Sequence, residues 1–201
     1  MRKIFIKLLL IFAFNLNAQN DSLKIEIKES KNPIIYATLD GLLGNGIFGG
    51  GSLNFQKNNH LVTFRIMNYQ RFELEAIFLI FPILVQKNST NEFALLYGKR
   101  WIYDNHAFAI LGGLSLNQNM RFQKDLAPEN TQTLGFPLEL SVHWFKSKKR
   151  PFRIIYGLVP VGPPTEIGRS FGFKIAGNIS KDFSYLGFGL TFGIGAHKVY
   201  K

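Results

Sequence analysis

The sequence predicts an all-β protein, a closed antiparallel up-and-down transmembrane β-barrel of about eight strands, with ten as the alternative count. Two observations lead to this prediction. Apolar residues alternate with small or polar residues over most of the chain, and side chains of a β-strand point alternately to opposite faces. The alternating segments are also long. A strand that crosses a bilayer needs ~9–11 residues, whereas a strand in a soluble sheet has ~5–6.

The clearest alternation lies between residues 134 and 145. One face of this segment is apolar throughout: Leu134, Phe136, Leu138, Leu140, Val142 and Trp144. The other face is mostly small or polar: Gly135, Pro137, Glu139, Ser141, His143 and Phe145. The same pattern predicts strands at 40–56, 60–72, 92–103, 106–118, 133–146, 151–159, 169–179 and 184–197.

The composition of the two strand faces indicates which face contacts lipid and which lines the interior of the barrel. Charged residues make up only 18% of the chain, whereas the outside of a soluble barrel is usually richly charged. Faces rich in Phe and Leu suit contact with lipid, and faces rich in Gly suit a narrow interior. The alternative is a soluble periplasmic β-barrel whose Phe-rich faces point inward and bind a lipid or another apolar ligand.

The N-terminal segment resembles an export signal in its layout. Basic residues flank a short apolar run, and a small residue, Ala18, follows it. The expected divisions are a signal peptide at 1–18, a polar tail at 19–33 and a single β-barrel domain at 34–201.

Charge and composition restrict the partners. The formal net charge is +11, and without the three basic residues of the signal peptide 24 − 3 = 21 basic residues remain against 13 acidic ones. Aromatic residues lie within apolar strands, so we expect no nucleic-acid binding. The basic residues are either scattered over the surface without a partner, or they bind phosphates of lipopolysaccharide or other surface anions. Because the chain has no Cys and four His, we expect no disulfide, no metal site and no cofactor.

If the polar faces line the interior, seven charged or amide side chains are candidates to meet there. They are Arg65, Arg71, Asn117, Glu139, His143, Lys174 and Asn178. Charges enclosed in a narrow barrel are expected to pair with one another. The interpretation is a polar network in the lumen that is either structural or in contact with a solute in a narrow passage.

A hydrolase is the enzyme class to consider, because Ser141 and His143 share a face with Glu139. Neighbours on one face of a strand lie ~7 Å apart, too far for a direct hydrogen bond. The chain also has no G-x-S-x-G motif. We therefore expect no catalysis.

Five segments carry a resemblance to a known family: the signal ending Asn17-Ala18-Gln19, GNGIFGGGSLNF (44–55), EFALLYGKRW (92–101), GGLSL (112–116) and GFPLEL (135–140). In these segments the chain resembles the small outer-membrane β-barrel proteins of Bacteroidota. An outer-membrane barrel is expected to contact membrane lipid, to be inserted by the barrel-assembly machinery and to be a monomer. The resemblance itself implies only the barrel fold and the outer-membrane location. It implies no activity, because many members of the family have no assigned function.

Two features of this strand set stay open. If both termini are periplasmic, the short turns 147–150 and 180–183 fall outside the cell and the longer connections 119–132 and 160–168 fall inside, which reverses the usual arrangement. The segment 73–86, broken by Pro82, is a further strand, an interfacial helix or a plug.

Overall fold

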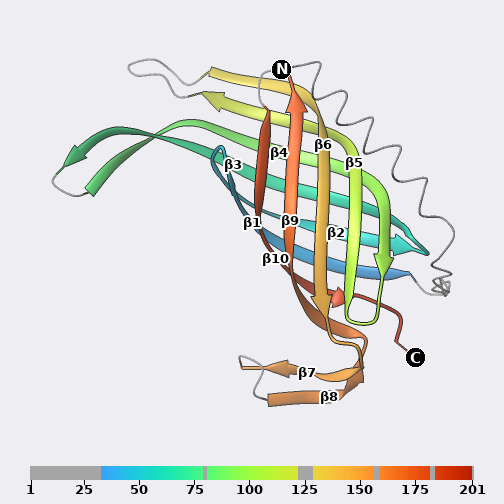
Figure 1. The fold of residues 1–201 in the computed structure, drawn as a ribbon. Helices are drawn as coiled ribbons and strands as arrows, with labels where there is room; N and C mark the ends of the chain where they lie inside the picture. The colour runs from blue at the N-terminus through green and yellow to red at the C-terminus, as the bar shows by residue number, and fades with distance from the viewer. Residues whose placement is uncertain (1–32, 79–80, 122–128, 156–158, 182–183, 201) are drawn as a thin grey trace, which may run out of the picture.

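The computed structural model describes residues 33–78, 81–121, 129–155, 159–181 and 184–200. They form ten β-strands (Figure 1): β1 (Ile34–Gly44), β2 (Ile47–Lys57), β3 (His60–Phe78), β4 (Phe81–Ile102), β5 (His106–Arg121), β6 (Glu129–Phe145), β7 (Arg150–Ile154), β8 (Val159–Thr165), β9 (Ile167–Ser180) and β10 (Tyr185–Ala196). Within these ranges no helix is long and apolar enough to cross a membrane. The expected signal peptide at 1–18 and nearly all of the tail at 19–33 lie outside the described residues.

Eight of the strands close into a barrel in the order β1-β10-β9-β6-β5-β4-β3-β2. Neighbours in this order are antiparallel, and β1 pairs with β10, so the sheet closes on itself and leaves no open edge. The strands β7 and β8 pair with each other in a separate two-stranded sheet, seen below the barrel in Figure 1. The predicted closed, antiparallel, eight-stranded barrel is confirmed.

Two predicted strands are wrong. The predicted number of barrel strands is still eight, because one of these segments holds two barrel strands and the other holds none. The segment 40–56 contains parts of two strands, β1 and β2, which meet at the tight turn Asn45-Gly46. Apolar residues on both sides of this glycine-rich turn hide it from a search for alternation. The segment 151–159 is not part of the barrel, because β7 pairs only with β8.

The open segment 73–86 belongs to a long hairpin. The strands β3 and β4 have 19 and 22 residues and stay paired as far as Phe78 and Phe81, with two register shifts on the way. Figure 1 shows this hairpin reaching well past the other strands. The segment is therefore a continuation of two barrel strands, which settles the choice between strand, helix and plug.

The barrel has two unlike ends. The start of β1 and the end of β10 lie at one end, here called the terminal end, together with the turns 58–59 and 103–105 and the β7–β8 sheet. The turn Asn58-Asn59 is tight, and Asn58 has a positive φ of 54°, which Asn tolerates better than most residues. The other end, here called the distal end, carries the long β3–β4 hairpin and the link from β5 to β6.

The corrected strand set changes the expected placement of the connections. Removing 151–159 from the barrel moves the long connection 119–132 to the distal end and the turn 147–150 to the terminal end. If the termini are periplasmic, the longest hairpin and this connection then face outward, as is usual for such barrels. Only the β7–β8 segment remains as a long connection at the terminal end.

Side chains alternate between the inside and the outside of the barrel as predicted. On β6, Leu134, Phe136 and Leu138 are exposed, whereas Glu139, Ser141 and His143 are buried. The same holds on β9, where Phe171 and Phe173 are exposed and Lys174 is buried. The Phe-rich faces are therefore on the outside, contrary to the alternative of a barrel with an apolar interior.

Candidate functional site

A network of buried ion pairs crosses the middle of the barrel. The guanidinium of Arg65 on β3 donates to Glu92 Oε1 on β4 through Nη2 (2.6 Å) and Nε (3.0 Å). It also donates through Nη1 to Glu139 Oε2 on β6 (2.9 Å). The side chain of Arg65 has no exposed surface. One arginine thus ties three strands together across the interior.

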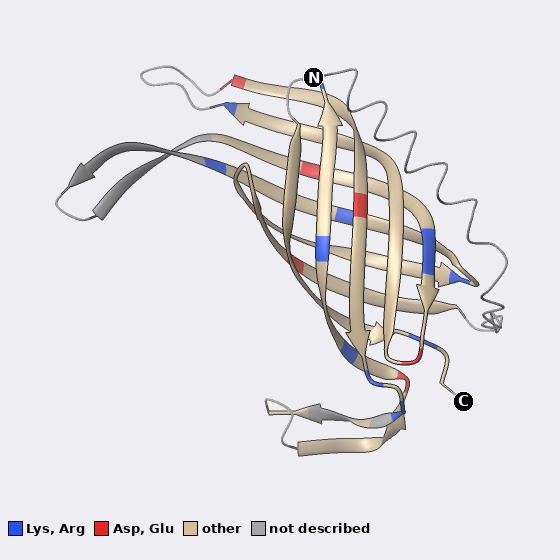
Figure 2. Ribbon diagram, in the orientation of Figure 1, with Lys and Arg blue, Asp and Glu red and all other residues tan. Residues whose placement is uncertain are grey.

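Lys174 on β9 extends these ion pairs to β1. Its Nζ donates to Asp40 Oδ2 (2.8 Å) and lies 3.1 Å from Glu139 Oε1. Glu139 thus has one oxygen on each cation. Figure 2 shows these acidic and basic positions midway along the strands.

Neutral side chains donate the remaining hydrogen bonds to Glu92. The Tyr185 hydroxyl donates to Glu92 Oε2 (2.8 Å), and Asn178 Nδ2 donates to the same oxygen. Asn178 Nδ2 also lies within hydrogen-bonding distance of Ser115 Oγ (2.8 Å) and Asn117 Oδ1 (2.9 Å). We call this set the central network: Asp40, Arg65, Glu92, Ser115, Asn117, Glu139, Lys174, Asn178 and Tyr185.

Gly135 makes room for the neutral part of the central network. A Cβ atom at this position would lie 2.3 Å from Asn178 Oδ1 and 2.6 Å from Asn117 Nδ2. Both distances are shorter than a van der Waals contact, so a larger residue would displace the amides. The glycine is needed because the amides approach the β6 backbone closely.

The central network closes the lumen. It contains two cations, Arg65 and Lys174, and three carboxylates, those of Asp40, Glu92 and Glu139. None of these five side chains is more than 3% exposed. A water-filled passage would give them accessible surface, so the barrel has no open path at this level.

A second cluster fills the terminal end around Arg100. Arg100 Nη1 donates to Gln56 Oε1 (2.7 Å) and to the backbone oxygen of His197 (3.1 Å). Its guanidinium carbon lies 4.8 Å from the ring centroid of Tyr36 and 5.8 Å from that of Phe145. No carboxylate forms an ion pair with Arg100 among the described residues, so the two aromatic faces and the acceptors take that role.

The structure brings six of the seven predicted interior residues inside. Arg65, Asn117, Glu139, Lys174 and Asn178 belong to the central network. His143 is also buried, but it lies toward the terminal end with its ring 6.1 Å from that of Tyr36. Arg71 follows the inward-facing Tyr69 on β3 but is exposed near the distal end, away from the buried network.

Several residues of the interior were missed by the sequence analysis. Asp40 and Glu92 are the first residues of two predicted strands, and Tyr185 is the second residue of another. The signal for Glu92 was present, because it alternates with Phe93 and Leu95 on the opposite face. Arg100 also has the inward parity of its strand, but basic residues near a strand end are usually assigned to the surface.

Glu139 is not placed as the carboxylate of a hydrolytic triad with Ser141 and His143. The Glu139 carboxylate is occupied by Arg65 and Lys174, so it does not orient His143. Over the described ranges, no group of three His, Cys, Asp or Glu is placed to hold a metal ion. The polar groups that sequence proximity suggested as catalytic are thus part of the barrel interior.

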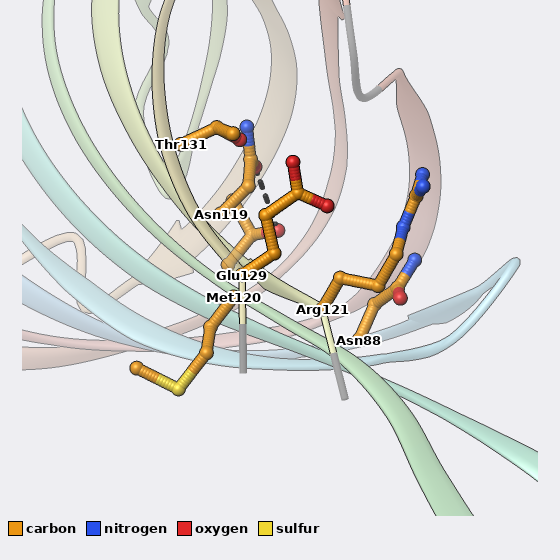
Figure 3. Close-up of a pocket in the computed structure, with 7 residues that line it drawn as sticks. Asn88, Asn119, Met120, Arg121, Glu129 and Thr131 are labelled. Carbon is orange, nitrogen blue, oxygen red and sulfur yellow. Dashed lines mark hydrogen bonds between the residues drawn. The ribbon is translucent and has the colours of Figure 1, made fainter. Parts of the chain in front are cut away.

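A cavity of about 370 Å³ opens at the distal end (Figure 3). It lies between β4, β5 and β6, and its lining is mostly amide and hydroxyl: Asn88, Thr90, Asn119, Met120, Arg121, Glu129 and Thr131. Thr90 Oγ1 donates to Asn119 Oδ1 (3.0 Å), and Asn119 Nδ2 donates to Thr133 Oγ1 (3.1 Å). The cavity is a polar opening at the distal end of the barrel, beyond the closed interior.

The outer wall is an apolar band with two different borders. Toward the distal end, four amide residues stand in register across four strands: Asn68, Asn91, Gln118 and Gln132. Toward the terminal end the border is aromatic and basic. Tyr97, Tyr103 and Trp144 are exposed there, and the Tyr103 ring stacks on His106 at 4.7 Å.

Comparison with solved structures supports the barrel fold. No protein-family model matches the chain, and no curated protein is similar to it in sequence. Among solved structures, the N-terminal β-barrel domain of Pseudomonas aeruginosa OprF is similar, with a TM-score of 0.54 and 12% sequence identity. The match covers 83% of this chain and 99% of that domain. At this identity the likeness shows the barrel fold and nothing about function.

Proposed function

We propose that this chain is an integral outer-membrane β-barrel with a closed lumen. Its role is to stabilise the envelope or to present its distal end to a surface partner, without catalysis. The observation that carries the proposal is the inverted arrangement of the wall, with Phe and Leu outside and paired charges inside. In water such an outside would be unstable, whereas in lipid it is the expected surface.

The height of the apolar band supports a membrane location. On β6 the outward run from Leu134 to Trp144 measures about 34 Å along the strand at ~3.4 Å per residue. With a strand tilt of ~40°, this corresponds to about 26 Å along the barrel axis, close to the ~25 Å band of outer-membrane barrels. The amide and aromatic borders then lie at the two membrane surfaces.

A narrow passage for solutes is the second candidate function, and the central network weighs against it. Arg65, Glu139 and Lys174 form contacts across the interior and have almost no accessible surface. In planar bilayers we expect no steady conductance from the protein. Stable single-channel currents would contradict the closed lumen and favour a passage.

The remaining partners follow from the location and are part of the proposal. They are membrane lipid, lipopolysaccharide at the distal end, and the barrel-assembly machinery that would insert a monomer. The likeness to Bacteroidota barrels, with export by the segment 1–18, belongs to the same proposal.

The first experiment is fractionation of the native envelope, followed by gel migration of the extracted protein with and without boiling. We expect recovery in the outer-membrane fraction and a mobility shift on boiling. Recovery as a soluble periplasmic protein without detergent would refute the membrane location.

A further inference from the structure

Three basic side chains form a row on the outside of the barrel at the terminal end. Lys57 is the last residue of β2 and pairs in register with His60, the first residue of β3. His60 in turn pairs with Lys99 on β4. All three are exposed. We call them the basic row; Figure 2 shows basic positions at the end of β2 and near the end of β4.

The geometry brings these bases close together. Residues directly opposite each other on antiparallel strands have Cβ atoms about 5 Å apart. The two lysines therefore flank His60 within about 10 Å of each other, which is within reach of one phosphate group for side chains of this length. They come from three different strands, so the barrel pairing holds them together.

The basic row has no acidic counterpart. Among the described residues, neither Lys57 nor Lys99 forms an ion pair with a carboxylate. Two other lysines of this end do have acidic partners: the exposed Lys149 pairs with Glu166, and the partly buried Lys198 pairs with Asp104. Within the described residues the row therefore presents positive charge that no carboxylate of the barrel neutralises, which favours an external anion.

An aromatic residue orients His60 at the centre of the row. The His60 ring stacks on Tyr97 with 5.9 Å between centroids, and its Nδ1 lies 2.6 Å from the Tyr97 hydroxyl. When the hydroxyl donates to Nδ1, the ring hydrogen is on Nε2, which can then donate to a phosphate oxygen. Tyr97 is 58% exposed, a position that suits an amphipathic ring at a membrane surface.

The position of the basic row at the border of the apolar band indicates which kind of anion it would bind. Along β2 and β3 it borders the apolar band directly, since Phe55 and Val62 are the next outward residues. Bases at this border would lie at the depth of lipid headgroups. The terminal end bears the short turns 58–59 and 103–105, which face the periplasm in such barrels, and so toward the phospholipid leaflet.

We propose that Lys57, His60 and Lys99 form a binding site for the phosphate of an anionic glycerophospholipid, with Tyr97 orienting the imidazole. This site rests on the proposed membrane location. Its ligand is a lipid of the periplasmic leaflet, and the two lysines supply charge while His60 supplies a directed hydrogen bond.

The test compares lipid binding by the full barrel in micelles, measured by native mass spectrometry with added phosphatidylglycerol or phosphatidylcholine of equal chain length. The wild type is expected to retain phosphatidylglycerol preferentially. A basic residue near a membrane surface contributes about fivefold in affinity, so Lys57→Gln with Lys99→Gln should weaken phosphatidylglycerol binding about 25-fold. His60→Leu should weaken it by a few fold.

The matched control removes two other lysines from the same end, with Lys146→Gln and Lys148→Gln, and should leave the preference unchanged. Equal losses in both double variants, or no loss in the first, would overturn the site while leaving the membrane location intact. A chain that fails to shift on boiling and enters no micelle would overturn the membrane location itself. Tighter binding of lipid A than of phosphatidylglycerol at the same three residues would assign the phosphate to the other leaflet and contradict the proposal.

Discussion

Replacing Lys174 by Met should be among the most damaging single changes in this barrel. Among the described residues, Lys174 is the only cation that pairs with Asp40. The Asp40 side chain has no exposed surface, and its Oδ1 atom has no hydrogen-bond partner among these residues. Removing the ammonium leaves Asp40 as a buried charge without compensation. Breaking a buried pair in this way costs about 3–5 kcal/mol.

The net charge of the central network predicts that loss of Lys174 and loss of Asp40 have unequal effects on stability. The wild type has two cations and three carboxylates, a balance of −1. Lys174→Met changes this to −2, whereas Asp40→Asn changes it to 0 and leaves Lys174 on Glu139. The double variant restores −1. Asp40→Asn should therefore cost much less than Lys174→Met, and the double variant should recover part of the loss.

The assay is urea unfolding of the barrel in lipid vesicles, followed by the fluorescence of Trp101 and Trp144, with gel migration to confirm folding. Lys181→Met is the matched control, because Lys181 is exposed at the distal end and its loss should change stability by less than about 0.5 kcal/mol. A Lys174→Met variant as stable as the control would refute the reasoning. So would a double variant no more stable than Lys174→Met.

Three further changes test other parts of the structure. Gly135→Val should lower the free energy of unfolding by about 1–3 kcal/mol, because the valine side chain would displace the amide of Asn178. Ser89→Val, on the outside of the barrel, is the control and should cause no such loss of stability. The hydrogen bond from Lys198 lowers the pKa of the Asp104 carboxyl below 3.8, so this contact contributes at higher pH and is lost as the pH falls through the lowered value. A carboxyl titration by NMR should find this midpoint below 3.8 and return it to the ordinary range in Lys198→Gln. Replacing 148–165 with an Asn-Gly turn should leave the heat-dependent gel shift unchanged, because this segment pairs only with itself; loss of the shift would place it in the barrel.

The sequence predicted the faces of the strands better than their ends. Alternation on β6 and β9 reflects side chains that point to the outside or to the interior of the barrel, and it can be recognised from a single strand. The turn at Asn45-Gly46 was missed because Leu43 and Ile47 keep the apolar pattern on both sides of it. The segment 151–159 was taken for one barrel strand because Ile154 and Val159 are apolar there too, although both are exposed outside the barrel.

The pairing inside the barrel could not be predicted from one sequence, because it depends on closure and register. Lys174 and Asp40 are 134 positions apart, and Arg65 and Glu139 are 74 apart. A shift of one residue in any barrel strand would turn its interior side chain to the outer face, so each buried ion pair also fixes the register of two strands. An uncompensated charge facing lipid is costlier than one facing water. The central network therefore stabilises the closed lumen and, by the same contacts, disfavours every slipped register that would bring Arg65, Lys174 or Glu139 to the outside.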